Sequence, residues 1–298
     1  MTLLSRPKTA PLPKFVTLVE VGPRDGLQNE AAFVPTAVKL DLIAKLKESG
    51  LRIIEATAFV SPKWVPQMRD HTELMRGLTH DNTTRYPVLV PNMQGFEAAL
   101  AAGARDISLF ASASESFSQQ NTNCSIATSL TRFEPVMIAA KHAGISVRGY
   151  VSCVVGCPYE GHIAPNAVRD VASALHAMGC SNISLGDTIG CGNPITTRHM
   201  IDAVATHVPI TALAGHFHDT HSAAMANIFA ALEMGVTTFD SSIAGLGGCP
   251  YAPGASGNIA TEDLVWFLHS LGIATGVDLE RLREIVPWIR THLGPLPR

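Results

Sequence analysis

The chain has 298 residues, of which 46% are hydrophobic and 16% are charged, and its formal net charge is −3. This balance and the absence of a long basic run argue against nucleic-acid binding, and no stretch is long and apolar enough to predict a membrane span. The apolar content suffices for a large core, so we expect a single domain over residues 1–298. Residues 1–14 hold three prolines and no acidic residue, and we expect them to form a loose extension.

Short runs rich in Val, Ile and Leu alternate with longer helical patterns. The runs predict strands at residues 16–22, 52–59, 87–91, 106–111, 146–152, 182–187, 211–218 and 238–244. The stretches between them predict helices at residues 36–49, 68–78, 95–102, 125–143, 165–178, 196–207, 222–233 and 261–271. This alternation predicts an α/β fold of the (β/α)₈ TIM barrel type. An additional C-terminal helix is expected at 279–292, within the last segment 277–298, packed across the barrel or at an oligomer contact.

Cysteines stand at positions 124, 153, 157, 180, 191 and 249, and no two of them form a Cys-x-x-Cys pair. This usage is typical of reduced thiols and predicts a cytoplasmic location. An organelle matrix is the alternative if the basic residues near the N-terminus belong to a processed targeting segment.

His216 and His218 close the seventh predicted strand, directly before Asp219. Side chains two residues apart on a strand point to the same face, so both imidazoles project together. A lone histidine here is more often a hydrogen-bonded core residue. Neutral imidazole is nevertheless a common metal ligand, and a pair that closes a barrel strand beside an acid indicates half of a metal site.

Unusual polar residues stand at the ends of other predicted strands, where barrel enzymes carry their chemistry. They are Arg24 and Asp25 after the first strand, Glu55 in the second, Asp187 at the end of the sixth, and Asn258 and Glu262 beyond the eighth. Charges that converge on one mouth are unfavourable unless a cation organises them. The alternative is structural: Asp25 could cap the first loop, and Glu55 could form an ion pair with Arg24.

Cys249 lies in a loop dense in glycine beyond the eighth predicted strand. An arbitrary cysteine is more often a small packed residue than a reactive one. A flexible loop over the barrel mouth, however, is a common place for a functional side chain.

Two imidazoles and Asp25, with Asn258 as a neutral oxygen donor, would give a mixed nitrogen and oxygen ligand set. The absence of a thiolate argues against structural zinc, and the set suits Mg²⁺ or Mn²⁺ with open positions for substrate oxygens. Two histidines and one carboxylate also describe a non-haem iron centre, so the ligands alone leave the metal open.

Several long motifs are recognisable at this point. Residues 19–30, 59–68, 149–153 with 156–161, 184–190 and 242–252 closely resemble the 3-hydroxy-3-methylglutaryl-CoA (HMG-CoA) lyase family. The likeness runs from about residue 15 to about residue 276. The family consists of metal-dependent TIM-barrel enzymes that break carbon–carbon bonds at acyl-CoA carbons.

The resemblance implies roles for particular residues. The family's metal ligands correspond to Asp25, His216, His218 and Asn258. Arg24 would stabilise an enolate oxygen, Cys249 would take part in proton transfer, and Asp25 and His216 are further candidates to carry protons. Supporting residues would be Gln28, Glu55, Asp187 and Glu262.

The implied reaction is the divalent-cation-dependent retro-Claisen cleavage of HMG-CoA to acetyl-CoA and acetoacetate. The implied cofactor is Mg²⁺ or Mn²⁺, and the implied partners are the acyl-CoA substrate and a second copy of the chain in a homodimer. The animal members carry a longer tail with a cysteine, and we expect no regulation by a tail disulfide here.

Two departures from the family pattern bear on the substrate. Ala31 stands where the family commonly has lysine, and His221 and Ser222 stand where it commonly has tyrosine and glycine. Both sites are expected near the mouth, so Ala31 and His221 are candidates for substrate specificity. A related lyase for a citramalyl- or methylmalyl-type thioester is therefore an alternative.

Two other classes are weighed against a lyase. A zinc hydrolase on the same barrel is disfavoured, because such enzymes usually carry their His-x-His pair on the first strand. A non-catalytic CoA-binding protein is disfavoured because it has no need for this complete set of polar residues.

Overall fold

The computed structural model describes residues 11–30, 32–247 and 257–293. Ala31, Cys249 and residues 1–10 of the expected N-terminal extension lie outside this range.

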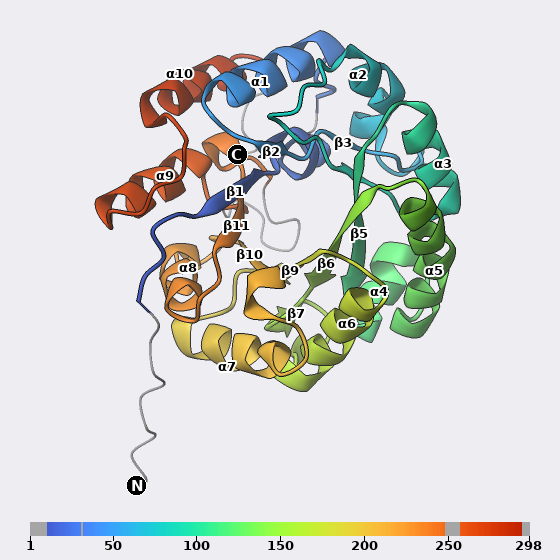
Figure 1. Cartoon of the computed structure of the whole chain (residues 1–298), viewed down its shortest axis with the longest axis vertical. Helices are drawn as coiled ribbons and strands as arrows, with labels where there is room; N and C mark the ends of the chain where they lie inside the picture. The colour runs from blue at the N-terminus through green and yellow to red at the C-terminus, as the bar shows by residue number, and fades with distance from the viewer. Residues whose placement is uncertain (1–10, 31, 248–256, 294–298) are drawn as a thin grey trace, which may run out of the picture.

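A ring of parallel strands forms the centre of the molecule (Figure 1). In spatial order the strands are β2 (Ile53–Ile54), β1 (Thr17–Glu20), β11 (Thr238–Ser241), β10 (Leu213–Phe217), β9 (Asn182–Asp187), β6 (Ser146–Ser152), β5 (Asp106–Ser112), β4 (Val88–Leu89) and β3 (Thr57–Ala58). Only Glu55 and Ala56 separate β2 from β3, so these two segments are halves of one strand. The Glu55 amide donates to the Glu20 carbonyl, and the Ala56 amide donates to the Pro87 carbonyl. The ring therefore closes, and the predicted barrel is confirmed.

Helices cover the outside of the ring (Figure 1). They are α1 (Thr36–Glu48), α2 (His71–Gly77), α3 (Met93–Ala101), α5 (Ile126–His142), α6 (Pro165–Ala177), α7 (Pro194–Ala205), α8 (Ala224–Glu233) and α9 (Thr261–Ser270). These agree with the predicted helices to within a few residues. The expected additional helix is α10 (Leu279–Arg290), which packs against α1 and α9 at the outer side of the ring. Within the described residues, no helix is both long and apolar enough to cross a bilayer.

Some elements at the loops were not predicted. The first loop opens with a π-helical turn, η1 (Gly22–Gly26), and another loop contains α4 (Glu115–Thr122). A short hairpin, β7 (Gly156–Cys157) with β8 (Gly161–His162), follows β6. The start of α8 was placed too early, because Ser222 has φ +56° and cannot continue a right-handed helix.

Glu20 fastens the first strand to the last loop and helix. Its side chain is fully buried and accepts hydrogen bonds from the amides of Gly22 (2.8 Å) and Ile243 (2.9 Å) and from Thr261 Oγ1 (2.6 Å). Ile243 begins the turn η4 (Ile243–Gly245), and Thr261 begins α9. Burial raises the pKa of the Glu20 carboxyl to about 7, despite these hydrogen bonds.

The raised pKa of Glu20 predicts how stability depends on pH. A carboxyl with a higher pKa in the folded state than in the unfolded state stabilises the fold below the unfolded value. That contribution is lost as the pH rises through the folded value. Glu20→Gln keeps an acceptor for both amides and gains a donor toward Thr261. As the pH rises from the ordinary pKa of 4.5 to about 7, the unfolding free energy of the wild type should fall by about 3 kcal/mol relative to that of this variant.

Urea denaturation of both proteins across this pH range measures the difference. If the unfolding free energies of the wild type and the variant changed with pH in parallel, the raised pKa of Glu20 would be contradicted.

Candidate active site

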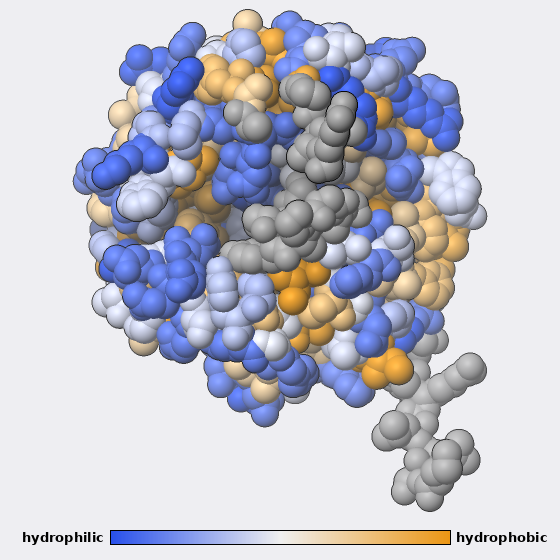
Figure 2. Space-filling view, turned by 180° about the vertical axis from the view of Figure 1, so that it is seen from behind, coloured by the Kyte–Doolittle hydropathy of each residue, from blue (hydrophilic) through white to orange (hydrophobic). Residues whose placement is uncertain are grey.

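A cavity of about 970 Å³ opens at the carboxyl ends of the strands. Its walls include Arg24, Asp25, Tyr150, His216 and His218. Figure 2 shows this face of the molecule, which is hollowed near its centre. Arg24 and Asp25 of η1, His216 at the end of β10 and His218 just after it therefore reach one space, as the sequence predicted.

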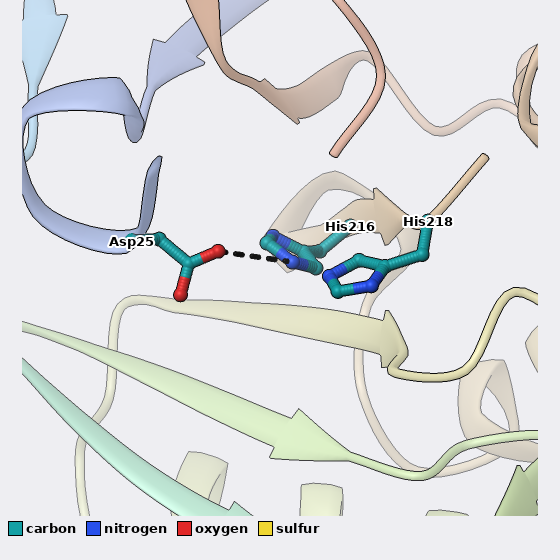
Figure 3. A group of neighbouring side chains, drawn as sticks. All are labelled: Asp25, His216 and His218. Carbon is teal, nitrogen blue, oxygen red and sulfur yellow. Dashed lines mark ion pairs between the residues drawn. The ribbon is translucent and has the colours of Figure 1, made fainter. Parts of the chain in front are cut away.

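Three candidate metal ligands meet in this cavity. One ligand atom from each of Asp25, His216 and His218 lies within 4.8 Å of the others. Asp25 Oδ2 and His216 Nε2 are 4.0 Å apart, and Figure 3 shows the three side chains directed toward one another. Asp25 projects from η1. His216 lies in β10 and His218 directly follows that strand, in extended backbone where alternate side chains share a face.

The chemical state of these side chains suits a divalent cation. His218 Nδ1 is buried and has no hydrogen-bond partner within the described residues, which is unfavourable for a polar atom unless a ligand completes it. Burial lowers the pKa of His218 to about 4, so its imidazole is neutral at pH 7. For Asp25, burial acts to raise the pKa, but Arg24 and the two imidazoles outweigh burial and hold it well below its usual range. A neutral imidazole and a carboxylate are the forms that bind metals.

His216 is oriented by a buried carboxylate. Its Nδ1 donates to Asp240 Oδ2 (3.1 Å), which leaves Nε2 facing Asp25. Asp240 also accepts from Ser184 Oγ (2.8 Å) and from Arg148 Nη2 (2.6 Å). Burial acts to lower the pKa of His216, but the hydrogen bond and charge of Asp240 outweigh it and raise that pKa. Carboxylates behind metal-binding histidines commonly fix the ring and its tautomer in this way.

Arg24 is held rigidly in the cavity wall. Its Nε donates to Glu55 Oε2 (2.7 Å), and its Nη1 donates to Asp25 Oδ1 (2.6 Å). Glu55 is fully buried and also accepts a hydrogen bond from Ser108 Oγ. Burial acts to lower the pKa of Arg24, but the two carboxylates outweigh it, so the guanidinium stays charged. The ion pair between Glu55 and Arg24 that was considered as a structural alternative therefore exists, and it supports the cavity wall.

Asn258 borders the same group. Its amide nitrogen donates to Asp25 Oδ2 (2.8 Å) and to the Leu246 carbonyl (3.1 Å), and its backbone amide donates to the Gly247 carbonyl (3.2 Å). Asn258 thus lies beside the candidate ligands with its amide nitrogen toward Asp25. Its role as an oxygen ligand stays a prediction.

Comparisons with known proteins identify the family. Residues 15–289 match the model of the HMGL-like family. The chain belongs to the HMGL-like family. The mitochondrial hydroxymethylglutaryl-CoA lyase of Bos taurus is 60% identical over 272 residues, which are 91% of this chain and 84% of that protein.

Two solved structures extend the likeness to the fold. Hydroxymethylglutaryl-CoA lyase from Pseudomonas aeruginosa is 53% identical, with a TM-score of 0.93 over 95% of each chain. An HMG-CoA lyase from Acinetobacter baumannii, in complex with coenzyme A and 3-methylmalate, is 38% identical, with a TM-score of 0.90 over 94% of this chain and 92% of that one. The family resemblance drawn from the motifs is confirmed.

The remaining supporting residues of this HMGL-like chain shape loops. Asp187 accepts from the amides of Cys191 (3.2 Å) and Gly192 (2.8 Å), which closes the turn after β9. Glu262 accepts from the amide of Ala244 (3.0 Å), a residue with φ +58° in η4. Gln28, by contrast, lines the cavity itself.

The two specificity candidates fare differently from the metal ligands. His221 is exposed, and the described residues that line the cavity do not include it. Its expected place in the substrate pocket therefore gains no support. Ala31 and Cys249 lie outside the described residues, so their roles stay predictions.

Sequence reasoning missed Arg148, Tyr150 and Asp240. Two guanidinium groups lie over the ring of Tyr150, with Arg24 Cζ 5.7 Å and Arg148 Cζ 5.0 Å from the ring centre. A signal was present, because Arg148 and Asp240 interrupt apolar strands. A charge inside a strand whose neighbours are buried needs a partner.

Asp240→Asn tests the orientation of His216. The variant removes the carboxylate that accepts from Nδ1, so Mn²⁺ should bind about 10- to 100-fold more weakly. Calorimetric titration with Mn²⁺ measures the affinity, and ¹⁵N chemical shifts of the apo protein report the tautomer of His216. Asp106→Asn is the matched control, because Asp106 also pairs with an arginine, Arg85, which is half exposed and outside the cavity lining. Unchanged binding in Asp240→Asn would remove Asp240 from this role.

Proposed function

We propose that this chain is a divalent-cation-dependent lyase that cleaves HMG-CoA to acetyl-CoA and acetoacetate. One observation carries the proposal: Arg24 places a buried, permanently charged guanidinium within 2.6 Å of Asp25 Oδ1, beside three candidate metal ligands in one cavity. The proposal is supported by the relatives, since the Bos taurus protein that is 60% identical is a hydroxymethylglutaryl-CoA lyase.

We propose Mg²⁺ or Mn²⁺ as the cofactor, held by Asp25, His216 and His218 with Asn258 as a further ligand. When bound, such an ion supplies Lewis acidity that favours loss of the proton from the 3-hydroxyl group of the substrate. The donor set contains no thiolate, which agrees with a hard cation that also accepts substrate oxygens.

The reaction itself is a retro-Claisen cleavage. The 3-hydroxyl oxygen loses its proton and becomes the ketone of acetoacetate, while the bond between C2 and C3 breaks. The electron pair of that bond passes to C2 as the enolate of the acetyl thioester, and C2 then takes up a proton. Atoms and charge balance without any redox partner.

Arg24 is the residue that suits the developing enolate. Its charge is fixed by Glu55 and Asp25 before substrate binds, so little reorganisation is needed when negative charge appears on the thioester oxygen. The ring of Tyr150 lies beside the guanidinium, and only 7% of Arg24 is exposed.

The contacts of Asp25 and His216 bear on which residue transfers protons in the reaction. The strongly lowered pKa of Asp25 makes it a weak base and suits it to metal binding. His216 already directs its Nδ1 proton to Asp240. We propose Cys249 as a participant in protonation of the enolate carbon, on the resemblance to the family.

A methylmalyl-type thioester is the second candidate substrate. The Acinetobacter baumannii relative was solved with coenzyme A and 3-methylmalate. The departures from the family pattern at Ala31 and at His221 and Ser222 are the sequence reasons for this alternative, and His221 is exposed outside the cavity lining.

The described cysteines Cys124, Cys153, Cys157, Cys180 and Cys191 are free thiols, and all but Cys191 are buried. We propose a reducing, cytosol-like compartment on this basis.

The homodimer stays a prediction.

The deciding assay supplies purified protein with Mg²⁺ or Mn²⁺ and one of several thioesters: HMG-CoA, citramalyl-CoA or methylmalyl-CoA. We expect acetyl-CoA and acetoacetate from HMG-CoA. Turnover of another thioester alone would reject the substrate but keep the bond cleavage, and no turnover of any would favour a CoA-binding protein.

Arg24→Gln should separate catalysis from metal binding. Loss of the enolate partner should reduce kcat by about 10²- to 10³-fold, while calorimetry should show Mn²⁺ still bound. Arg85→Gln removes an arginine from a pair outside the cavity lining and should leave both unchanged. A variant at Arg24 that keeps wild-type kcat would exclude the proposed role.

A further inference from the structure

A buried lysine lies behind the cavity wall. Lys39 of α1 is only 1% exposed. Its Nζ donates to Asp70 Oδ1 (2.8 Å) and to the main-chain carbonyl of Gln67 (2.5 Å). We call Lys39, Gln67 and Asp70 the Lys39 cluster. The cleavage chemistry uses none of them, so their burial needs another explanation.

Gln67 binds the loop between β1 and α1 at alternate residues. Its Oε1 accepts from the Val34 amide (2.9 Å), and its Nε2 donates to the carbonyls of Ala32 (2.8 Å) and Glu30 (3.3 Å). The side chain is buried, with 4% of the residue exposed. One amide group therefore replaces the hydrogen bonds that this irregular backbone cannot make to itself.

Further contacts extend the same attachment. Asp70 Oδ2 accepts from Thr36 Oγ1 (2.9 Å), at the start of α1. Phe33 contacts two cations, with Lys39 Nζ 4.7 Å and the Arg69 guanidinium 3.8 Å from the centre of its ring. Residues 30 and 32–34 of the first loop, and the start of α1, are thus fastened to Gln67, Arg69 and Asp70.

Both segments form part of the cavity wall. Gln28 and Asn29 line it from the first loop, and Ser61, Trp64 and Val65 line it from the second. Asp25 has separate contacts, to Arg24 and Asn258. The Lys39 cluster can therefore shape this wall without touching the candidate metal ligands.

The buried charges of the Lys39 cluster indicate a role in positioning the backbone more than in net folding stability. A buried ion pair gains little net stability over apolar side chains of similar size, whereas a paired and hydrogen-bonded one restricts the backbone to a single arrangement. Lys39 donates hydrogen bonds to Asp70 and to the main chain of Gln67. These bonds fix the position from which the Gln67 side-chain amide reaches the loop.

We propose that Gln67 is a positioning residue for the acyl-CoA substrate. Held by Lys39 and Asp70, it keeps residues 27–30 and 32–35 against the segment 59–70 and so sets the shape of the wall that the acyl-CoA contacts. The identity of the ligand rests on the proposed function. The residue acts on substrate binding and leaves the metal centre and the bond cleavage to other groups.

Gln67→Met tests this role, because methionine fills a similar volume and removes all three side-chain hydrogen bonds. The KM for HMG-CoA should rise about tenfold, equivalent to about 1.4 kcal/mol. The kcat value should stay within about threefold and the Kd for Mn²⁺ within about twofold, because the variant spares the groups that act on them. Gln94→Met, at an exposed position of α3 outside the cavity lining, is the control and should change nothing.

Two results would overturn the proposal: a wild-type KM, or a parallel loss of kcat and Mn²⁺ affinity that indicates general disruption. If Gln67→Met does not fold, Gln67→Asn carries the same test, since its shorter amide cannot reach all three partners. If the wild type does not cleave HMG-CoA, the proposed function fails separately. The Kd for coenzyme A, measured by calorimetry, then decides the inference, with a tenfold weakening expected in Gln67→Met and an unchanged Kd rejecting it.

Discussion

Two buried arginine–carboxylate pairs fix the positions of side chains inside the barrel and at its mouth. Arg24 pairs with Glu55, and Arg148 pairs with Asp240. Because Arg148 lies on β6 and Asp240 on β11, which are not neighbours in the ring, the second pair spans the barrel interior. Loss of one partner from such a pair commonly costs about 3–5 kcal/mol, because the other charge stays buried.

Each pair also governs a neighbouring side chain in the cavity. The first fixes a guanidinium against Asp25, and the second directs a carboxylate at His216. Buried charge therefore does not act mainly through net stability here. It determines where a positive group, a carboxylate and an imidazole stand before any ligand arrives, which is the arrangement that electrostatic catalysis requires.

Much of the fold and part of the site could be predicted from sequence. Periodicity determines the strands and helices, and the two-residue spacing of His216 and His218 determines that they share a face. Arg148 and Asp240 escaped prediction because their contact joins residues 92 positions apart through the barrel interior. His221 is exposed in the turn before α8, and residue type alone does not reveal that exposure.

The parallel pairing of β1 with β11 makes the ring depend on its last strand. Glu20 bonds to Thr261, 241 residues away, and Asp25 bonds to Asn258, 233 residues away. Asp25 is synthesised early and the two histidines are synthesised late, so these candidate ligands are not all present until most of the chain has been made. Contacts of such sequence separation form slowly. The three candidate ligands can therefore converge only after β10 has joined the ring, and a translation product that stops before β11 should leave the candidate site incomplete.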